Sequence, residues 1–433
     1  MNKHGFFTVL LAILLAAVMM LTLSACNRGE QNGTTAPTEG TTAPTTGDEA
    51  NYPTIKGAKL SWDLINSVPV KTANMDITEA RKLCVDFFRI SKTALWIPDT
   101  KYEAKDADGK VLRTMEGGKI YGGLPLLPKG HGNIYRLMDY IDPQTGVVDV
   151  QAAGKKLELF GNECSGAAYW GWGRVINSVA FNFPEKMLHK NGYLRLGSYT
   201  YDDSVDALST SYRTTDILKS NDAQVIYQAY ALLKAGDGVV YFTSAGHMAM
   251  ISQDAHVEYK ADGTIDPAKS YVYIIDQAGT WKEGTNAEGD TFTYAIDNDV
   301  KWTFITMFNK QYMPFTFAEW QGTDPIEETV ISYSHTGSTI SLDQLYGSQV
   351  TCNYGLSDVY AIIKDNGGKE VYKLAVRPTA VHQMTMTFEK DNQDNVAWGS
   401  LDTLDQTKEY TVEIIAQIAT GERPTLWTGK LAQ

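Results

Sequence analysis

Apolar side chains recur at helical spacing in three parts of this 433-residue chain. In EARKLCVDFFRI, Leu83, Phe87 and Ile90 fall on one face of a predicted helix. A second helix, with Cys164 in its first turn, is predicted through AAYWGWGRVINSVAF, although its glycines lower the helical preference. SNDAQVIYQAYALLKAGD predicts an amphipathic third helix that ends at Gly236.

Alternation of apolar and polar positions predicts strands directly after these helices. GVVYFTSAGHMAMIS predicts two short strands around a Ser-Ala-Gly turn, with His247 at the start of the second. YVYIIDQAG predicts a further strand that ends in Asp276 and Gln277. Because successive side chains point to opposite faces of a strand, only one of these two can approach His247.

The C-terminal part, 326–433, contains short β-rich runs such as ETVISYS, DVYAIIK and EYTVEIIAQI, separated by Gly, Asp and Asn turns. This pattern is typical of a β-sandwich. LDTLDQTKEYTVEIIA resembles the tyrosine-corner stretch of fibronectin-type domains, with Leu404 and Tyr410 in the matching places. We therefore expect an immunoglobulin/fibronectin-like sandwich that carries no catalytic residue.

The first residues have the features of a secretory signal. Lys3 and His4 precede an apolar run over 6–21 that is too short to span a membrane. The Leu-Ser-Ala-Cys that follows resembles a bacterial lipobox, in which the cysteine is lipidated. This resemblance implies a signal peptide over 1–26 and a lipid on Cys26 that holds the protein on the extracytoplasmic face of a bacterial membrane; ordinary cleavage beside a chance cysteine is the alternative.

A tract rich in Thr, Pro and Gly follows the signal and predicts a disordered tether over 27–55, because it has almost no apolar side chains to bury. The remaining length suffices for two domains, divided as 56–325 and 326–433. The formal net charge is −13, with no basic run after the signal, which argues against a nucleic-acid partner.

The number of cysteines predicts a free thiol. With Cys26 assigned to lipid, Cys84, Cys164 and Cys352 remain, an odd number that cannot all pair. Cys84 and Cys352 lie among periodic apolar residues and are predicted to be core positions. Cys164 lies at a predicted helix start, where the backbone dipoles favour the thiolate, so it is the candidate nucleophile; a small buried hydrophobic residue is the alternative.

A nucleophilic thiol needs a base and a group that orients the base. His247 is the candidate base because it follows Cys164 at the start of a strand. Asp276 is the candidate orienting residue because a carboxylate is the better partner for an imidazolium, and Gln277 is the alternative. The histidines show no zinc-ligand spacing, and no phosphate loop or dinucleotide fingerprint is present, so no metal or organic cofactor is expected.

These motifs together resemble the NlpC-type cell-wall peptidases and the related CHAP amidases, over roughly residues 80 to 320. The family pattern is Asp-Cys-Ser-Gly opening a helix, Gly-Asp before a strand, Gly-His on the next strand and a third polar residue after it. The matching stretches here are Glu163-Cys164-Ser165-Gly166, Gly236-Asp237, Gly246-His247, and Asp276 or Gln277. The chain departs from the pattern in having Glu163 for aspartate and no histidine at the third position.

The resemblance implies an α+β protein with a papain-like (NlpC-type) domain before the all-β immunoglobulin-like sandwich. It implies that Cys164 attacks an amide of peptidoglycan stem peptides, with His247 as base. Relatives also carry a tyrosine ahead of the cysteine, and Tyr121 in KIYGGLP is similar, although further upstream; it would help the Cys164 N–H to hold the oxyanion.

Two other functions stay open. A transglutaminase-like acyltransferase or protease also has Cys, His and Asp in this order along the chain. A non-catalytic wall-binding or adhesion lipoprotein would retain the fold alone. The Gly-Asp and Gly-His pairs favour the peptidase, and the sequence identifies no protein partner.

Overall fold

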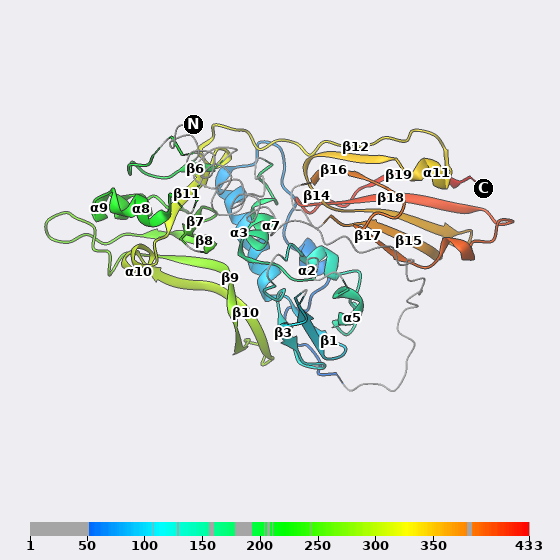
Figure 1. Ribbon diagram of the computed structural model, residues 1–433, viewed down its shortest axis with the longest axis horizontal. Coiled ribbons are helices and arrows are strands. Elements are labelled where there is room, and N and C mark those ends of the chain that lie inside the picture. The colour runs from blue at the N-terminus through cyan, green and yellow to red at the C-terminus, as the bar shows by residue number, and fades with distance from the viewer. Residues whose placement is uncertain are drawn as a thin grey trace, which may run out of the picture. The chain divides into compact units, whose positions relative to one another are not determined.

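The structure is a computed structural model that combines helices with β-sheets (Figure 1). It describes residues 52–106, 108–127, 130–155, 160–177, 193–202, 204–205, 208–209, 211–243, 245–378 and 383–432, all within one compact unit, Thr41–Gln433. The expected α+β class is therefore confirmed. The predicted signal peptide, Cys26 and most of the predicted tether lie outside the described residues.

The helices nearest the candidate site begin at polar residues. α3 (Ile77–Thr93) begins after Asp76, whose carboxylate accepts hydrogen bonds from the N–H groups of the first turn. The other α-helices of the described residues are α2 (Trp62–Asn66), α4 (Ile134–Leu137), α5 (Val150–Ala153), α7 (Cys164–Trp172), α8 (Thr214–Lys219), α9 (Ala223–Tyr230), α10 (Phe304–Asn309) and α11 (Leu342–Leu345). Short 3-10 turns lie at Glu319–Gln321 and Leu401–Thr403. In the described part of the chain, no helix has the length and apolarity needed to cross a membrane.

Two helices are shorter than the sequence predicted. α7 ends at Trp172, and Gly173 occupies its C-cap. The sequence predicted that the helix continues to residue 181. This prediction is wrong for residues 173–177, and the residues after 177 lie outside the described segment. α9 ends at Tyr230 rather than Gly236. The residues between them form turns, and Gly236 has a φ of 83°. A glycine suits this left-handed conformation, from which the next strand begins.

A nine-stranded sheet carries the candidate base and its partner. Its order is β5-β1-β4-β10-β9-β8-β7-β11-β6, and the run from β10 to β6 is antiparallel. The strands are β1 (Leu95–Pro98), β4 (Tyr121–Gly122), β5 (Val147–Val148), β6 (Tyr193–Arg195), β7 (Gly238–Phe242), β8 (Gly246–His256), β9 (Tyr271–Thr285), β10 (Thr291–Thr303) and β11 (Met313–Phe317). A separate hairpin pairs β2 (Tyr102–Lys105) with β3 (Val111–Met115).

Strands β7 and β8 pair in antiparallel fashion, which confirms the predicted hairpin. The next strand, β9, is longer than predicted, since it runs on to Thr285. Asp276 and Gln277 consequently lie within the strand rather than at its end. Both are buried there. Because buried polar groups need hydrogen-bond partners, the partners show which of the two residues contacts His247.

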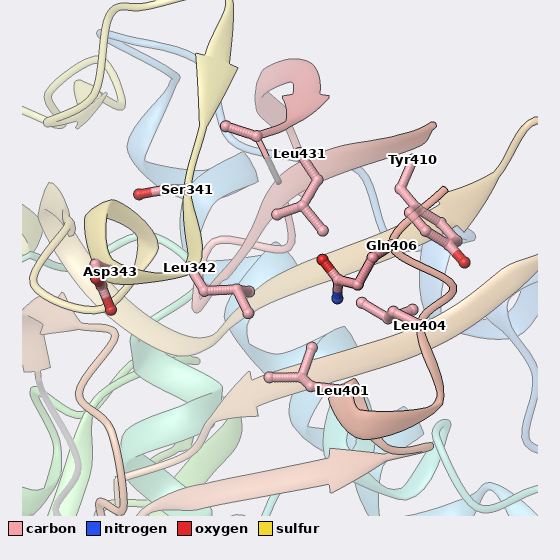
Figure 2. Close-up of a pocket in the computed structure, with 9 residues that line it drawn as sticks. Ser341, Leu342, Asp343, Leu401, Leu404, Gln406, Tyr410 and Leu431 are labelled. Carbon is pink, nitrogen blue, oxygen red and sulfur yellow. The ribbon is translucent and has the colours of Figure 1, made fainter. Parts of the chain in front are cut away.

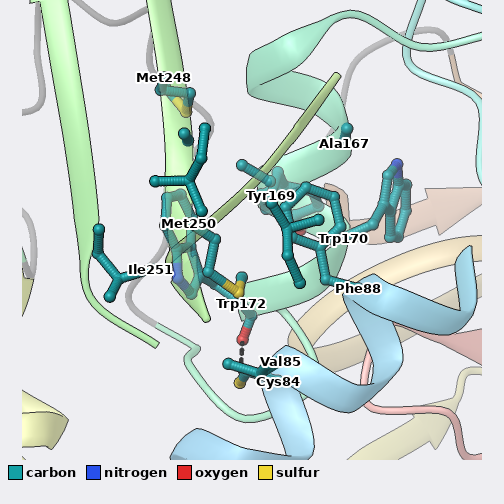
Figure 3. Close-up of a cluster of buried hydrophobic side chains, with 14 of the residues drawn as sticks. Cys84, Val85, Phe88, Ala167, Tyr169, Trp170, Trp172, Met248, Met250 and Ile251 are labelled. Carbon is teal, nitrogen blue, oxygen red and sulfur yellow. Dashed lines mark hydrogen bonds between the residues drawn. The ribbon is translucent and has the colours of Figure 1, made fainter. Parts of the chain in front are cut away.

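Helix α7 packs against α3 and against β8 and β9. Figure 3 shows this buried cluster, in which Phe88 of α3 and Met250 of β8 meet α7. A Cβ added at Gly171 would lie 2.8 Å from the Met250 methyl carbon and 3.1 Å from Phe88, so the glycine permits close packing. The Cys84 thiol also donates to the carbonyl of Trp172 at 3.7 Å. This packing fixes the helix that begins at Cys164 against the strand that carries His247.

A buried ion pair also connects α3 to the sheet. The Arg81 guanidinium donates to Asp237 Oδ1 at 2.9 Å, and Thr316 donates to the same oxygen at 2.6 Å. The second oxygen of Asp237 accepts the backbone N–H of Lys234 at 2.8 Å. Asp237 therefore shapes the turn before β7, as its sequence position suggests, and is satisfied by structural contacts.

The C-terminal strands form one hydrogen-bonded sheet of eight strands, joined through the long β14. They are β12 (Ile331–Tyr333), β13 (Thr339–Ile340), β14 (Gln349–Asp365), β15 (Glu370–Val376), β16 (Gln383–Thr387), β17 (Asn395–Trp398), β18 (Tyr410–Ile418) and β19 (Thr425–Leu431). Their main apolar core is separate from that of the preceding residues. The Tyr410 hydroxyl accepts the backbone N–H of Asp405 at 2.9 Å, the contact that defines a tyrosine corner.

Candidate active site

Cys164 is the first residue of α7, so it lies at the start of a helix, as the sequence predicted. Glu163 occupies the N-cap but makes no side-chain capping bond, so its carboxylate does not occupy the amides of the first turn. Those amides present the positive end of the helix dipole to the thiol. Cys164 is partly exposed, whereas Cys84 and Cys352 are buried, as predicted.

The three described cysteines are all free thiols, and they differ in how deeply they are buried. Burial raises the pKa of the Cys84 thiol and, more modestly, that of Cys352. A thiol that stays protonated in an apolar core is a poor nucleophile. Cys164 is therefore the reactive candidate among the cysteines that the structure describes.

His247 lies between Cys164 and Asp276. Its Nε2 is 2.8 Å from Oδ2 of Asp276, and Cys164 is close enough to act electrostatically on the imidazole. The structure thus brings together the three residues that the sequence selected, and the contact expected between His247 and Asp276 is present.

The surroundings of His247 favour its charged form. Burial alone would lower the pKa of the imidazole, but hydrogen bonds and charges from Asp276 and Cys164 together raise it to about 10. A proton held on the imidazole near neutral pH is the complement of a thiolate on the neighbouring cysteine.

Gln277 contacts a different group. Its amide nitrogen donates to the carbonyls of Leu124 and Ala295 at 3.1 and 3.3 Å, and its Oε1 accepts a hydrogen bond from Lys92. Lys92 is a buried residue of α3 that the sequence reasoning missed, because one lysine in a helical pattern gives no signal of burial.

Tyr121 lies in an aromatic cluster of β4. Its ring contacts Trp96 and Trp281, and its hydroxyl accepts the backbone N–H of Glu116 at 2.9 Å. None of its described contacts joins it to Cys164 or His247. The assignment of Tyr121 to the oxyanion therefore gains no support from this geometry.

A different tyrosine lies beside the triad. The Tyr312 ring centroid is 6.4 Å from that of His247, and Tyr312 is electrostatically coupled to Asp276 and Cys164. Burial raises the pKa of its hydroxyl, so Tyr312 stays neutral and able to donate a hydrogen bond. No motif in the sequence pointed to Tyr312, which directly precedes strand β11.

Polar side chains also surround the start of α7. Ser165 donates to Glu163 Oε1 at 2.8 Å, and Nε2 of His131 lies 3.7 Å from the same oxygen. Glu163 thus contacts two polar side chains beside the start of the helix, which gives it a structural role there. His131 was also missed by the sequence reasoning.

A pocket lies away from these residues. This pocket of about 230 Å³, in the C-terminal part of the chain, is lined by Ser341, Leu401, Leu404, Tyr410 and Leu431 among others. Figure 2 shows these side chains. It contains none of the candidate catalytic residues. Across the described ranges, no group of three or more His, Cys, Asp or Glu side chains is placed to hold a metal ion.

The chain was compared with known proteins. No model of a protein family matches it. No curated protein is significantly similar to it either. The NlpC-type resemblance therefore rests on the motifs alone.

Proposed function

We propose that this chain is an exported, lipid-anchored cysteine hydrolase that cleaves amide bonds in peptidoglycan peptides. The observation that carries the proposal is the 2.8 Å bond between His247 and Asp276, with Cys164 at the start of α7 close enough to act on the imidazole. A thiol at a helix start, a base and a buried carboxylate are the groups that nucleophilic acyl transfer needs. The substrate class comes from the motif resemblance.

The proposed reaction follows from the charges of the triad. The Cys164 thiolate attacks the amide carbonyl carbon, and the carbonyl π electrons move onto oxygen, where the Cys164 N–H stabilises them. His247 gives its proton to the leaving amine as the C–N bond breaks, which leaves a thioester. His247 then takes a proton from water, whose oxygen attacks the thioester and releases the acid; the thiolate and imidazolium are restored.

We extend the proposal to the fold and the location. A cysteine-led helix packed on antiparallel strands that carry histidine and aspartate supports a papain-like domain over 56–325. The tyrosine corner supports an immunoglobulin-like domain over 326–433. A lipid on Cys26 would hold both outside the cytoplasmic membrane.

Replacing Cys164 by Ala tests the activity. Cys164→Ala should abolish product release from a peptidoglycan peptide, followed by mass spectrometry, and leave the thermal midpoint within a few degrees, because the thiol is partly exposed. Cys84→Ala is the matched control: this buried thiol should contribute to stability but not to turnover. Activity retained by Cys164→Ala would contradict the proposal.

Acyl transfer to an amine is the second candidate, because the same contacts among Cys164, His247 and Asp276 serve a transglutaminase-like enzyme. A primary amine added to the assay separates the two: new amide products indicate transfer, and acid products alone indicate hydrolysis. A non-catalytic lipoprotein would show neither, and iodoacetamide would alkylate its Cys164 slowly.

A further inference from the structure

A buried ammonium group lies beside the candidate triad. Lys92, in the last turn of α3, is 1% exposed. Its Nζ donates to Gln277 Oε1 and, over 3.4 Å, to Asn162 Oδ1, and it lies 5.3 Å from the centroid of the Phe88 ring. Both acceptors are neutral amide oxygens. Because a buried charge is costly without a compensating ion, the anions that face this ammonium matter.

Those anions belong to the candidate site. Asp276 of β9 and Cys164 of α7 are the acidic groups that act on Lys92. Oδ1 of Asp276 is buried and has no hydrogen-bond partner among the described residues, since His247 of β8 takes the other oxygen. Two groups that ionise to anions thus face two that ionise to cations, and the four charges sum to zero when all are ionised.

We infer that Lys92 is a positioning residue of this site, whose charge, held in place by Gln277 and Asn162, stabilises the Cys164 thiolate beside the imidazolium. The inference rests on the proposed function, because it is a nucleophilic thiolate that benefits from the charge. Coulomb attraction is strong here because little water screens the buried ammonium. Arg89, one turn earlier in α3, is engaged elsewhere with Asp299 of β10 at 3.1 Å.

The surrounding chemistry agrees with this role. Burial lowers the pKa of Lys92 to about 7, against the opposing effect of the Asp276 and Cys164 charges. Lys92 is therefore an ammonium below about pH 7, and the Asp276 and Cys164 charges favour that form. The contact also gives Gln277 a part in the site that differs from orienting His247.

The pH profile of Cys164 alkylation by iodoacetamide, read by peptide mass spectrometry without substrate, tests the inference. Lys92→Met removes the charge at similar volume and should move the acid limb to higher pH, with a rate at pH 6 lowered about tenfold. Lys92→Arg, which keeps the charge, should recover part of that rate. Lys71→Met is the matched control, because Lys71 is also buried but donates to the carbonyl of Glu327; its profile should not change.

The outcomes separate this inference from the proposed function. A folded Lys92→Met protein with an unchanged profile overturns the inference alone. A wild-type Cys164 alkylated no faster than free cysteine overturns the proposed function. Should Lys92→Met not fold, as judged by circular dichroism, Gln277→Glu serves instead: its carboxylate neutralises the ammonium in place, so the acid limb should move the same way, and an unmoved limb refutes the role of Lys92.

Discussion

Replacing Asp276 by Asn removes one charge from the triad and keeps the shape of the side chain. The bond between His247 Nε2 and Asp276 Oδ2 is 2.8 Å long, and the two side chains are only 20% and 5% exposed, so solvent screens it weakly. A hydrogen bond to a charged group contributes about 1.5–3 kcal/mol. Because one pH unit corresponds to about 1.4 kcal/mol, the loss is worth about one to two units on the titration of the pair.

The direction of the change with pH follows from the pKa of His247, which the folded protein raises to about 10. In Asp276→Asn the imidazolium is less stable, so its pKa falls and the alkaline limb of turnover moves to lower pH. The thiolate then keeps its charged partner over a narrower pH range, so alkylation of Cys164 near neutral pH should be slower. Turnover near neutral pH should fall by more than about tenfold.

Iodoacetamide alkylation from pH 5 to 10 gives the acid limb, and mass spectrometry of the products of one peptidoglycan peptide gives turnover. Asp299→Asn is the matched control. It also removes a carboxylate, but from the neighbouring strand β10, where Asp299 pairs with Arg89 near the surface. Both limbs and turnover should stay at wild-type values in that variant. An unchanged pH profile and unchanged turnover in a folded Asp276→Asn protein would refute the reasoning.

The remaining predictions concern the anchor and the stability of the fold. Cys26→Ser should release the protein to the medium or leave an unprocessed precursor, because the proposed lipid needs that thiol; membrane association that persists in fractionated cells would count against the lipobox. Arg81→Met should lower the free energy of unfolding by about 3 kcal/mol, measured by urea denaturation, because it leaves the carboxylate of Asp237 buried without its counter-ion. Lys82→Met, which breaks an exposed pair, should change it by less than about 1 kcal/mol, and an equal effect of both would show that the buried pair is not special.

Several features of the chain depend on short-range patterns, and these could be predicted from the sequence. The helix around Cys84, the hairpin of β7 and β8 and the buried state of Cys84 and Cys352 follow from the period of their apolar neighbours. The hydroxyl of Tyr410 contacts a residue five positions before it, so its corner is also a local feature. The ends of α7 and α9 were predicted wrongly, because helix ends depend on the turns and packing that follow them.

The site shows what required the tertiary structure. Strand alternation predicted that only one of Asp276 and Gln277 could reach His247, but which face of β9 meets the imidazole depends on how the neighbouring strands align. Lys92 and Gln277 are 185 positions apart, and no local pattern marks either as a partner of the other. Burial and Coulomb coupling arise only when such distant segments pack together and exclude water, so the charge balance around Cys164 is a property of the folded chain.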